Sequence, residues 1–266
     1  MNELAGGQRS AASIRPAMKS QAISAQSSGL GVAILIPALN EAAAIERAVS
    51  SAWDAGADEV IVADGGSTDA TVELARSAGA HVITSPRGRA LQQNAAAAEA
   101  TADVLLFQHA DNWCSADCLT QIREALSDKD ILGGAFRQRI DAPGFRFRLL
   151  EWGNAMRVRL FRLPYGDQGI FMRREVFERL GRFPEVALME DVLLMQKFRR
   201  LARPVLLPGP HFVSARRWHR HGVLRQTLRN WRILLAHTLG ASPDRLVEMY
   251  VRHDAKASDT PDTPSV

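Results

Sequence analysis

Short apolar runs alternate with stretches of helical periodicity along the first half of the chain. The runs cover residues 32–36, 60–63, 81–84 and 104–107. Their length and their apolar or β-branched content are typical of buried parallel strands. The segments between and after them predict helices that begin near residue 40 and then cover 70–78, 89–102 and 115–126. Strands that alternate with helices in this way build an open α/β sheet with right-handed crossovers.

From Gly133 onward the pattern changes. Residues 135–140 alternate between apolar and polar side chains, as a half-exposed strand does. Further strands are predicted at 168–172 and at 203–207, where Pro208 is expected to end the run. Helices are predicted at 144–161, from Arg174 onward and at 190–201. The predicted fold class is therefore α/β, with a mixed, mainly parallel central sheet flanked by helices.

The first strand–helix–strand unit spans Val32 to Asp69 and carries polar residues after both strands. Pro37 is expected to end the first strand, because proline cannot donate to a β-ladder. Asn40 is expected to cap the following helix, with Glu41 in its first turn. The second strand leads directly into an acidic, glycine-bearing loop at residues 64–69. Ligands of open α/β sheets bind at the carboxyl ends of the strands, so these loops are the predicted ligand site.

Neither loop has a phosphate-binding fingerprint. The first reads PALNE at residues 37–41, which is neither the G-x-G-x-x-G of dinucleotide-binding folds nor the G-x-x-x-x-G-K-[ST] of a P-loop. Cradling of a phosphate by this turn is therefore not expected. The carboxylates of Asp64 and Asp69 are better suited to hydrogen bonds with a nucleobase or a ribose, or to helping bind a cation.

The PALNE loop and the sequence VADGGSTD at residues 62–69 resemble the beginning of family-two glycosyltransferases. The resemblance extends over about residues 31–250. It implies one GT-A, Rossmann-like domain at residues 31–253, completed by a C-terminal amphipathic helix. Residues 1–30 and 254–266 are rich in small and polar side chains, and we expect them to be disordered extensions.

The resemblance also implies a site for a nucleotide-sugar donor. The residues that it places around the donor are Pro37, Ala38, Asn40, Glu41, Asp64, Gly65, Asn94, His109, Ala110 and Arg217. The family holds Mg²⁺ or Mn²⁺ with the last acid of a D-x-D motif, which stands here as His109-Ala110-Asp111. Asp111 is thus the expected metal ligand, an oxygen donor of the kind that such cations prefer. His109 replaces the first acid, and it either contacts the nucleotide or the metal or only ends the strand.

Glu190 and Asp191 form the second candidate for chemistry. Adjacent acids at the start of a helix commonly complement the helix dipole. In the family the equivalent pair supplies the catalytic base, and LMED at residues 188–191 after GRFP at 181–184 is similar. An inverting transfer needs a carboxylate that takes the proton from the attacking hydroxyl. We assign this role to Asp191, with Glu190 as the second choice or as a residue that binds the acceptor.

Two further segments are candidates for the acceptor side. The glycines of YGDQG at residues 165–169 allow a close approach to a ligand, so Asp167 and Gln168 are candidate acceptor contacts; a tight turn explains the segment equally well. Arg217 and Trp218 resemble the end of a Q-x-x-R-W motif, although Ser214 stands where glutamine is expected. Arg217 is suited to neutralise a diphosphate, and Trp218 to pack beneath the acceptor.

Positive charge is concentrated in one region of the chain. The 266 residues carry a net charge of +4, and between Asp191 and Asp244 there are ten lysines and arginines and no acid. This excess predicts an anionic partner such as a diphosphate or a lipid head group, or else a surface that is merely solvated. Residues 222–239 form a basic amphipathic pattern, expected to pack on the domain or, as the second choice, to lie peripherally on a membrane. Nucleic-acid binding is not expected.

The remaining features point to a cytoplasmic protein. No apolar run is long enough to span a bilayer, and residues 1–30 lack the apolar core of a secretory signal. Cys114 and Cys118 are expected on one helix as reduced thiols, because two thiols do not complete a metal site.

The leading hypothesis is an inverting glycosyltransferase that uses a nucleotide-sugar donor, a divalent cation and a small-molecule or lipid acceptor. A nucleotidyltransferase is the alternative among enzymes, although PALNE is not the glycine-rich basic loop of that class. A non-catalytic nucleotide-binding or membrane-associated partner protein is the alternative outside enzymes. TSPRGR at residues 84–89, HAD at 109–111, GDQ at 166–168 and SARRW at 214–218 most closely resemble a compact bacterial subgroup, part of which is associated with arsenosugar biosynthesis.

Overall fold

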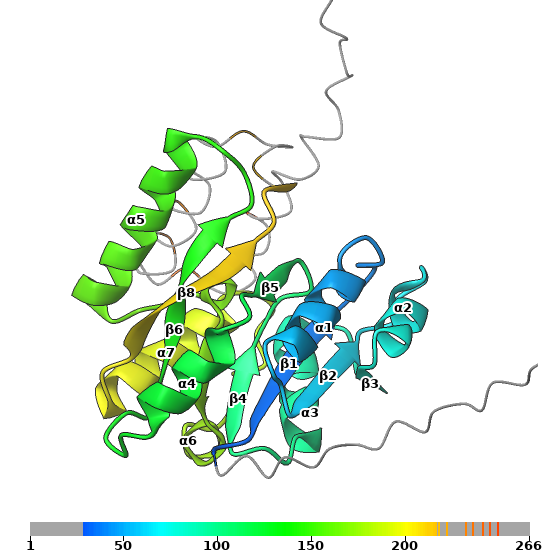
Figure 1. The fold of residues 1–266 in the computed structure, drawn as a ribbon, viewed down its shortest axis with the longest axis horizontal. Helices are drawn as coiled ribbons and strands as arrows, with labels where there is room; N and C mark the ends of the chain where they lie inside the picture. The colour runs from blue at the N-terminus through cyan, green and yellow to red at the C-terminus, as the bar shows by residue number, and fades with distance from the viewer. Residues whose placement is uncertain are drawn as a thin grey trace, which may run out of the picture.

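An eight-stranded mixed sheet with the order β3-β2-β1-β4-β7-β6-β8-β5 runs through the chain (Figure 1). The computed structural model describes residues 29–216 and the single positions 218, 222, 232, 236, 241, 245 and 249. The strands are β1 (Val32–Ala38), β2 (Glu59–Asp64), β3 (His81–Thr84), β4 (Val104–Phe107), β5 (Asn112–Cys114), β6 (Gly133–Ile140), β7 (Ile170–Arg173) and β8 (Val205–Val213). The helices are α1 (Ile45–Asp54), α2 (Thr71–Ser77), α3 (Arg89–Glu99), α4 (Cys118–Leu126), α5 (Phe145–Phe161), α6 (Arg174–Arg179) and α7 (Glu190–Leu201), and a short 3₁₀ helix, η1, covers Gly166–Gln168.

The first four strands are parallel, as the sequence predicts. Strand β1 lies between β2 and β4, and β3 pairs with the other side of β2. Residues 32–36 of β1 are completely buried, which is why this run is apolar without alternation. Beyond β4 the sheet becomes mixed, because β7 is antiparallel to both β4 and β6, whereas β6 and β8 are parallel. The predicted mixed α/β sheet is confirmed.

Helices cover both faces of the sheet and form two apolar cores. Helices α1, α2 and α4 bury their apolar residues against one face. Helices α3, α6 and α7 cover the other face, where Phe107, Phe177 and Phe183 meet at ring-centre distances of 4.8–5.4 Å. The side chains of Ile45, Val49 and Ala52 face the sheet, as their spacing predicts.

Two prolines do not end strands, contrary to prediction. Pro37 lies inside β1, opposite Ala63 of β2. The pairing of β1 with β4 ends at Leu35, so the missing N–H of Pro37 faces a side on which the ladder has already stopped. Pro208 lies inside β8, where three residues on β8 stand opposite one on β6; this bulge leaves proline without a required ladder bond.

Other local predictions are also corrected. Asn40 does not cap a helix, because α1 begins only at Ile45 and Glu41 precedes its first turn. Strand β5 was not predicted, since three residues are too short to show a pattern. Cys114 lies in this strand and Cys118 begins α4, so they do not share a helix; both are buried and free.

The predicted terminal extensions and the predicted basic helix at 222–239 fall outside the described residues, apart from isolated positions. Among the helices that the structure describes, none combines the length and apolar character needed to cross a membrane.

Candidate active site

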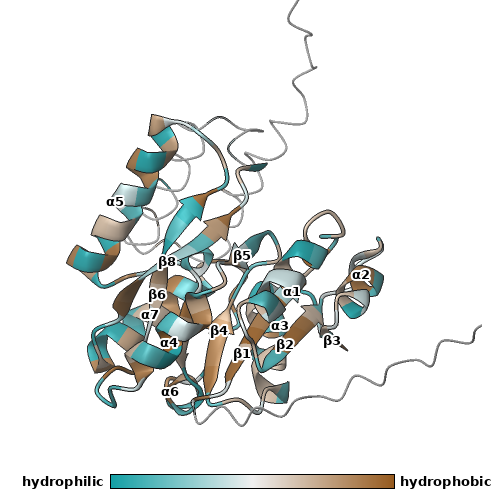
Figure 2. Ribbon diagram, viewed as in Figure 1, coloured by the Kyte–Doolittle hydropathy of each residue, from teal (hydrophilic) through white to brown (hydrophobic). Residues whose placement is uncertain are grey.

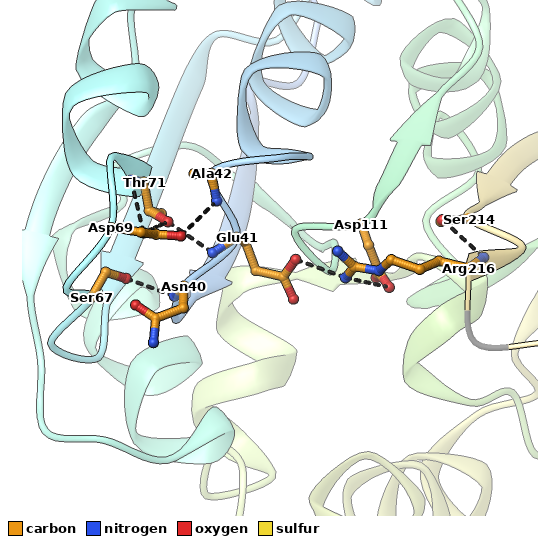
Figure 3. A network of polar contacts seen from close by, with 9 residues as sticks. All are labelled: Asn40, Glu41, Ala42, Ser67, Asp69, Thr71, Asp111, Ser214 and Arg216. Atoms are coloured by element: carbon orange, nitrogen blue, oxygen red, sulfur yellow. Dashed lines mark hydrogen bonds and ion pairs between the residues drawn. The ribbon is translucent and has the colours of Figure 1, made fainter. Parts of the chain in front are cut away.

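The loops after β1 and β2 are tied to each other by hydrogen bonds (Figure 3). The backbone N–H of Asn40 donates to Ser67 Oγ at 2.9 Å, and Asn40 Oδ1 accepts from the N–H of Thr68 at 2.8 Å. Asn40 adopts a left-handed conformation with φ of 53°, which asparagine tolerates better than most residues. Asp69 accepts from Ala42 N and from Thr71, and the Thr71 hydroxyl lowers the pKa of this carboxyl. The two loops therefore form one preorganised surface.

Asp64 fixes the second loop from within. Its buried carboxylate accepts hydrogen bonds of 3.0 Å from the N–H groups of both Gly66 and Ser67. The carbonyl of Ala38 accepts from Gly65 N at 2.9 Å and from Gln92 Nε2 at 2.7 Å. A Cβ at Gly65 would lie 3.0 Å from the Gln92 amide, so a larger residue here would require this hydrogen-bonded side chain to shift. The sequence did not single out Gln92, because nothing in its helix marks it.

Glu41, Asp111 and Arg216 form a charged cluster between β1, β4 and β8 (Figure 3). Arg216 Nη2 lies 2.8 Å from Glu41 Oε2 and 3.8 Å from Asp111 Oδ2. The hydrogen bond to Glu41 raises the pKa of Arg216, so its guanidinium stays charged. Arg216 was not predicted, because the motif resemblance selected its neighbour Arg217, which lies outside the described residues.

This cluster suits a hard divalent cation that is shared with a phosphate. Among the described residues, no group of three or more His, Cys, Asp or Glu side chains converges to hold a metal alone. Mg²⁺ typically binds through one or two carboxylates together with substrate phosphates. Asp111 and Glu41 supply such oxygens, and Arg216 already neutralises them with a positive charge in the structure.

Three segments come close together at His109, Gly166 and Asp191. His109 follows the end of β4, Gly166 begins η1, and Asp191 lies in the first turn of α7. A Cβ built on Gly166 would lie 3.0 Å from His109 Nε2 and 3.1 Å from Asp191 Oδ2. The Gly166 N–H donates to Asp191 Oδ2 at 2.6 Å, and the Val192 N–H donates to Asp191 Oδ1 at 2.8 Å. By these distances His109 Nε2 lies at most about 6 Å from the Asp191 carboxylate. His109 thus stands beside the predicted base.

Glu190 is held differently from Asp191. Its side chain is almost completely buried and accepts hydrogen bonds from Arg89 through both carboxylate oxygens. Burial raises the pKa of Glu190, and the charge of Arg89 opposes this shift. Glu190 is buried and paired with a charged arginine, whereas Asp191 is only half-buried and is held by backbone N–H groups, so the geometry favours Asp191 as the group that reaches a substrate.

Of the predicted acceptor contacts, Asp167 borders this site and Gln168 is the more deeply buried. Gln168 is fully buried; its Oε1 accepts from Arg157 Nη2 at 2.6 Å and its Nε2 donates to the carbonyl of Phe136. The Gln168 side chain is thus engaged within the protein, and its contact with an acceptor stays a prediction. Asp167 is half-buried, and its carbonyl accepts from Asn112 Nδ2. Arg157, which sequence reasoning missed, also lies 3.4 Å above the ring centre of Tyr165.

Two other predicted site residues make contacts within the protein. Asn94 exchanges two hydrogen bonds with the backbone of Phe183, of 2.9 and 3.0 Å, so its amide is engaged there. Trp218 packs edge-on against Phe147 of α5, beside Ile140. Ala110 is buried, and only its backbone is available for a ligand.

The sheet order and its flanking helices are those of the GT-A fold, and solved structures agree. *S. aureus* TarS 1-349 in complex with UDP-GlcNAc has a TM-score of 0.56 at 18% identity, over 70% of this chain and 58% of that one. Glucosyl-3-phosphoglycerate synthase from *Mycobacterium tuberculosis*, in complex with Mn²⁺, UDP and glucosyl-3-phosphoglycerate, has a TM-score of 0.52 at 21% identity, over 76% and 77% of the two chains. These likenesses establish the fold.

Residues 33–181 match the model of Glycosyl transferase family 2, which is more than half of the chain. The chain belongs to this family. Glycosyltransferase AglJ of *Haloferax volcanii* is 35% identical over 141 residues, which is 51% of this chain and 46% of AglJ. The match thus spans about half the length of this relative. The association with the arsenosugar subgroup stays a prediction.

Proposed function

We propose that the chain is an inverting glycosyltransferase that moves a sugar from a nucleoside-diphosphate donor to an acceptor hydroxyl. The observation that carries this proposal is the meeting of His109, Gly166 and Asp191, since it joins the end of β4 to the start of α7. A carboxylate suited to take a proton thereby lies beside the loop after β4, which carries His109 and Asp111. A donor-binding edge without such a carboxylate would support nucleotide binding only.

The proposed reaction uses Asp191 as the base. Its carboxylate takes the proton of the acceptor hydroxyl as the hydroxyl oxygen attacks the anomeric carbon. The bond from that carbon to the diphosphate oxygen breaks, and the nucleoside diphosphate leaves with the electron pair. Because attack comes from the face opposite the leaving group, the configuration inverts. Gly166 N–H and Val192 N–H hold the two oxygens of Asp191 in one orientation during this step.

The charged cluster would serve the leaving group. Asp111 and Glu41 would hold Mg²⁺ or Mn²⁺, which neutralises negative charge on the departing diphosphate when it is bound. Arg216 is positioned to add a second positive charge at the same place. The loops tied by Asp64 and Asn40 would receive the nucleoside, through the backbone of Pro37, Ala38 and Gly65 and the carboxylate edge of Asp64. The half-buried Asp167 would contact the acceptor.

Calorimetric titration with UDP and GDP, with and without Mn²⁺, tests the donor site. We expect metal-dependent binding of one nucleotide and, in Asp111→Ala, at least about tenfold weaker binding, because the carboxylate that would hold the cation is lost. Asp117→Ala is the matched control, since Asp117 is exposed and its carboxylate accepts hydrogen bonds from the side chains of Ser115 and Gln121, away from the charged cluster. Failure of the folded wild-type protein to bind either nucleotide would contradict the proposal.

A further inference from the structure

Helix α5 exposes an apolar stripe on the side opposite to the one that it buries. The stripe consists of Phe145, Leu149, Trp152, Met156 and Leu160. These positions recur every three or four residues and so share one helix face. Phe145 is 78% exposed, and Trp152 is 59% exposed. Phe147 and Val158 point the other way and are buried. The helix is therefore apolar on both sides, and packing among the described residues explains only one of them.

Arginines flank the stripe, and acidic side chains do not. Arg146 and Arg159 lie on its two sides, and Arg162 follows the end of the helix; all three are exposed. They make no ion pair within the part of the chain that the structure describes. Glu151 is the only acid in α5, which is described in full, and it is half-buried and bonded to Arg148 at 3.0 Å. The exposed face of α5 is thus apolar at its centre and positive at its edges.

A groove beside the stripe carries further positive charge. Its lining comes from α5, β6 and β8 and includes Arg137, Arg139, Arg148, Glu151 and Trp152. Glu151 pairs with Arg139 and Arg148, so three arginines and one acid leave the groove with net positive charge. Arginine guanidinium groups bind phosphate oxygens well, often through two N–H groups at once. The groove is therefore suited to a phosphate head group next to an apolar stripe. Figure 2 shows hydrophobic residues recurring along α5, which lies at the outer edge of the molecule.

We propose that the exposed face of α5 docks onto an anionic lipid bilayer, with the helix axis in the plane of the interface. The 17 residues of α5 form a stripe about 25 Å long. The apolar side chains would enter the boundary of the acyl chains, and the flanking arginines would contact lipid phosphates. A second copy of the chain fits this face less well, because a symmetric contact would bring the same arginines against one another.

The docking face and the candidate active site share a helix. Arg157 of α5 reaches inward and donates to Gln168 of η1, directly behind Gly166. Docking through α5 would thus place the acceptor side of the site near the bilayer surface. The docking itself does not depend on the proposed transfer reaction, and it is measured without substrate.

Vesicle co-sedimentation of the full chain tests the proposal. We expect binding to mixed phosphatidylglycerol–phosphatidylcholine vesicles, weak binding to pure phosphatidylcholine, and a decrease with added salt. Trp152→Glu should lower the partition coefficient at least about tenfold, because it places a charge at the centre of the stripe. Arg146→Ala and Arg159→Ala should each lower it about fivefold. Trp53→Glu is the control, because Trp53 is an exposed tryptophan on α1, away from α5; it should bind as the wild type does.

Fluorescence locates the contact. Lipids with brominated acyl chains should quench the wild-type emission more than that of Trp152→Phe, which keeps an apolar residue and should still bind. Unchanged vesicle binding by Trp152→Glu would overturn the proposal, since another segment would then carry the binding. A wild-type dimer that Trp152→Glu dissociates, without any vesicle binding, would also overturn it and assign the stripe to self-association.

Discussion

The donor side and the acceptor side of the candidate site are built in different ways. On the donor side, loops that directly follow β1 and β2 are held by backbone N–H groups and short side chains, as in the contacts of Asp64 with Gly66 and Ser67. On the acceptor side, the contacts join the helices α3, η1 and α7 to one another. Arg89 reaches Glu190 across 101 positions of the sequence, and Gly166 reaches Asp191 across 25.

The two sides of the site therefore depend on different parts of the chain. The loops after β1 and β2 are held mainly by side chains of the first strand–helix–strand unit and by Gln92, so a nucleotide site can persist as the rest of the chain changes. A site assembled from η1, α5 and α7 depends on each contributing segment. We therefore infer that substitutions on the two sides will affect different measurements, namely donor affinity and turnover.

The largest expected effect is on the acceptor side. Asp191→Asn should lower the rate of sugar transfer by about 10²–10⁴-fold, because the variant cannot take a proton from the hydroxyl. The affinity for the donor nucleotide should change little, since Asp191 contacts η1 and its own helix rather than the donor loops. Steady-state kinetics with the sugar nucleotide that matches the preferred nucleotide, together with calorimetry, measures both quantities.

Asp64→Ala provides the opposite case. It removes the acceptor of the Gly66 and Ser67 N–H groups and should weaken nucleotide binding while leaving the rate at saturating donor nearer to that of the wild type. If Asp191→Asn lost donor affinity instead of rate, the division into two sides would be wrong.

The same division explains how much the sequence could predict. Apolar runs and loop motifs gave the parallel half closely: strands at 81–84 and 104–107 have the predicted bounds. The predictions at Pro37 and Pro208 were wrong because a strand accepts a proline wherever the neighbouring strand does not pair with that position. This depends on how the sheet is assembled and not on the apolar run itself. Strand β5 is too short to leave a pattern.

The candidate site was predicted unevenly for a related reason. Asp64, Asp111 and Asp191 follow strands or begin a helix, so their positions could be inferred from local pattern. The roles of Arg89, Arg157 and Arg216 depend on which distant carboxylate or amide they meet. Gln168 and Asn94 are polar residues near the site whose contacts turn out to be internal. No spacing in the sequence distinguishes an internal amide from one that faces a ligand.

A buried histidine should make the stability of the acceptor side depend on pH. His211 of β8 is fully buried, and its ring stacks on Phe136 at 6.1 Å. Burial lowers its pKa from 6.5 to about 4, so it stays neutral in the folded protein. Between pH 6.5 and about 4 the unfolded chain binds a proton that the folded chain does not. The free energy of unfolding should therefore fall with falling pH in this window, by up to about 3 kcal/mol from this group.

Urea unfolding across this pH window checks the effect. His211→Gln should be less stable at neutral pH, yet it should lose less stability than the wild type on acidification. His81→Gln, which changes an exposed histidine at the start of β3, should follow the wild-type curve. Parallel curves for His211→Gln and the wild type would show that His211 is not the group responsible.

The smallest expected effect is also the most local test of the acceptor side. Gly166→Ala adds a methyl group 3.0 Å from His109 Nε2 and 3.1 Å from Asp191 Oδ2, so one of these side chains must move. A displacement of a few tenths of an ångström to one ångström at the base should lower the transfer rate about 10–100-fold. The loops at Asn40 and Asp64 are not touched, so nucleotide affinity should stay unchanged.

Gly153→Ala is the matched control on a neighbouring element. Its added methyl group meets no atom within 4 Å, and Gly153 lies inside α5, so the variant should keep its rate and gain about 0.5–1 kcal/mol of stability. A wild-type transfer rate in Gly166→Ala would show that displacing His109 or Asp191 does not affect the reaction. The close meeting of β4, η1 and α7 would then be a packing contact, and the base would have to be sought elsewhere on the acceptor side.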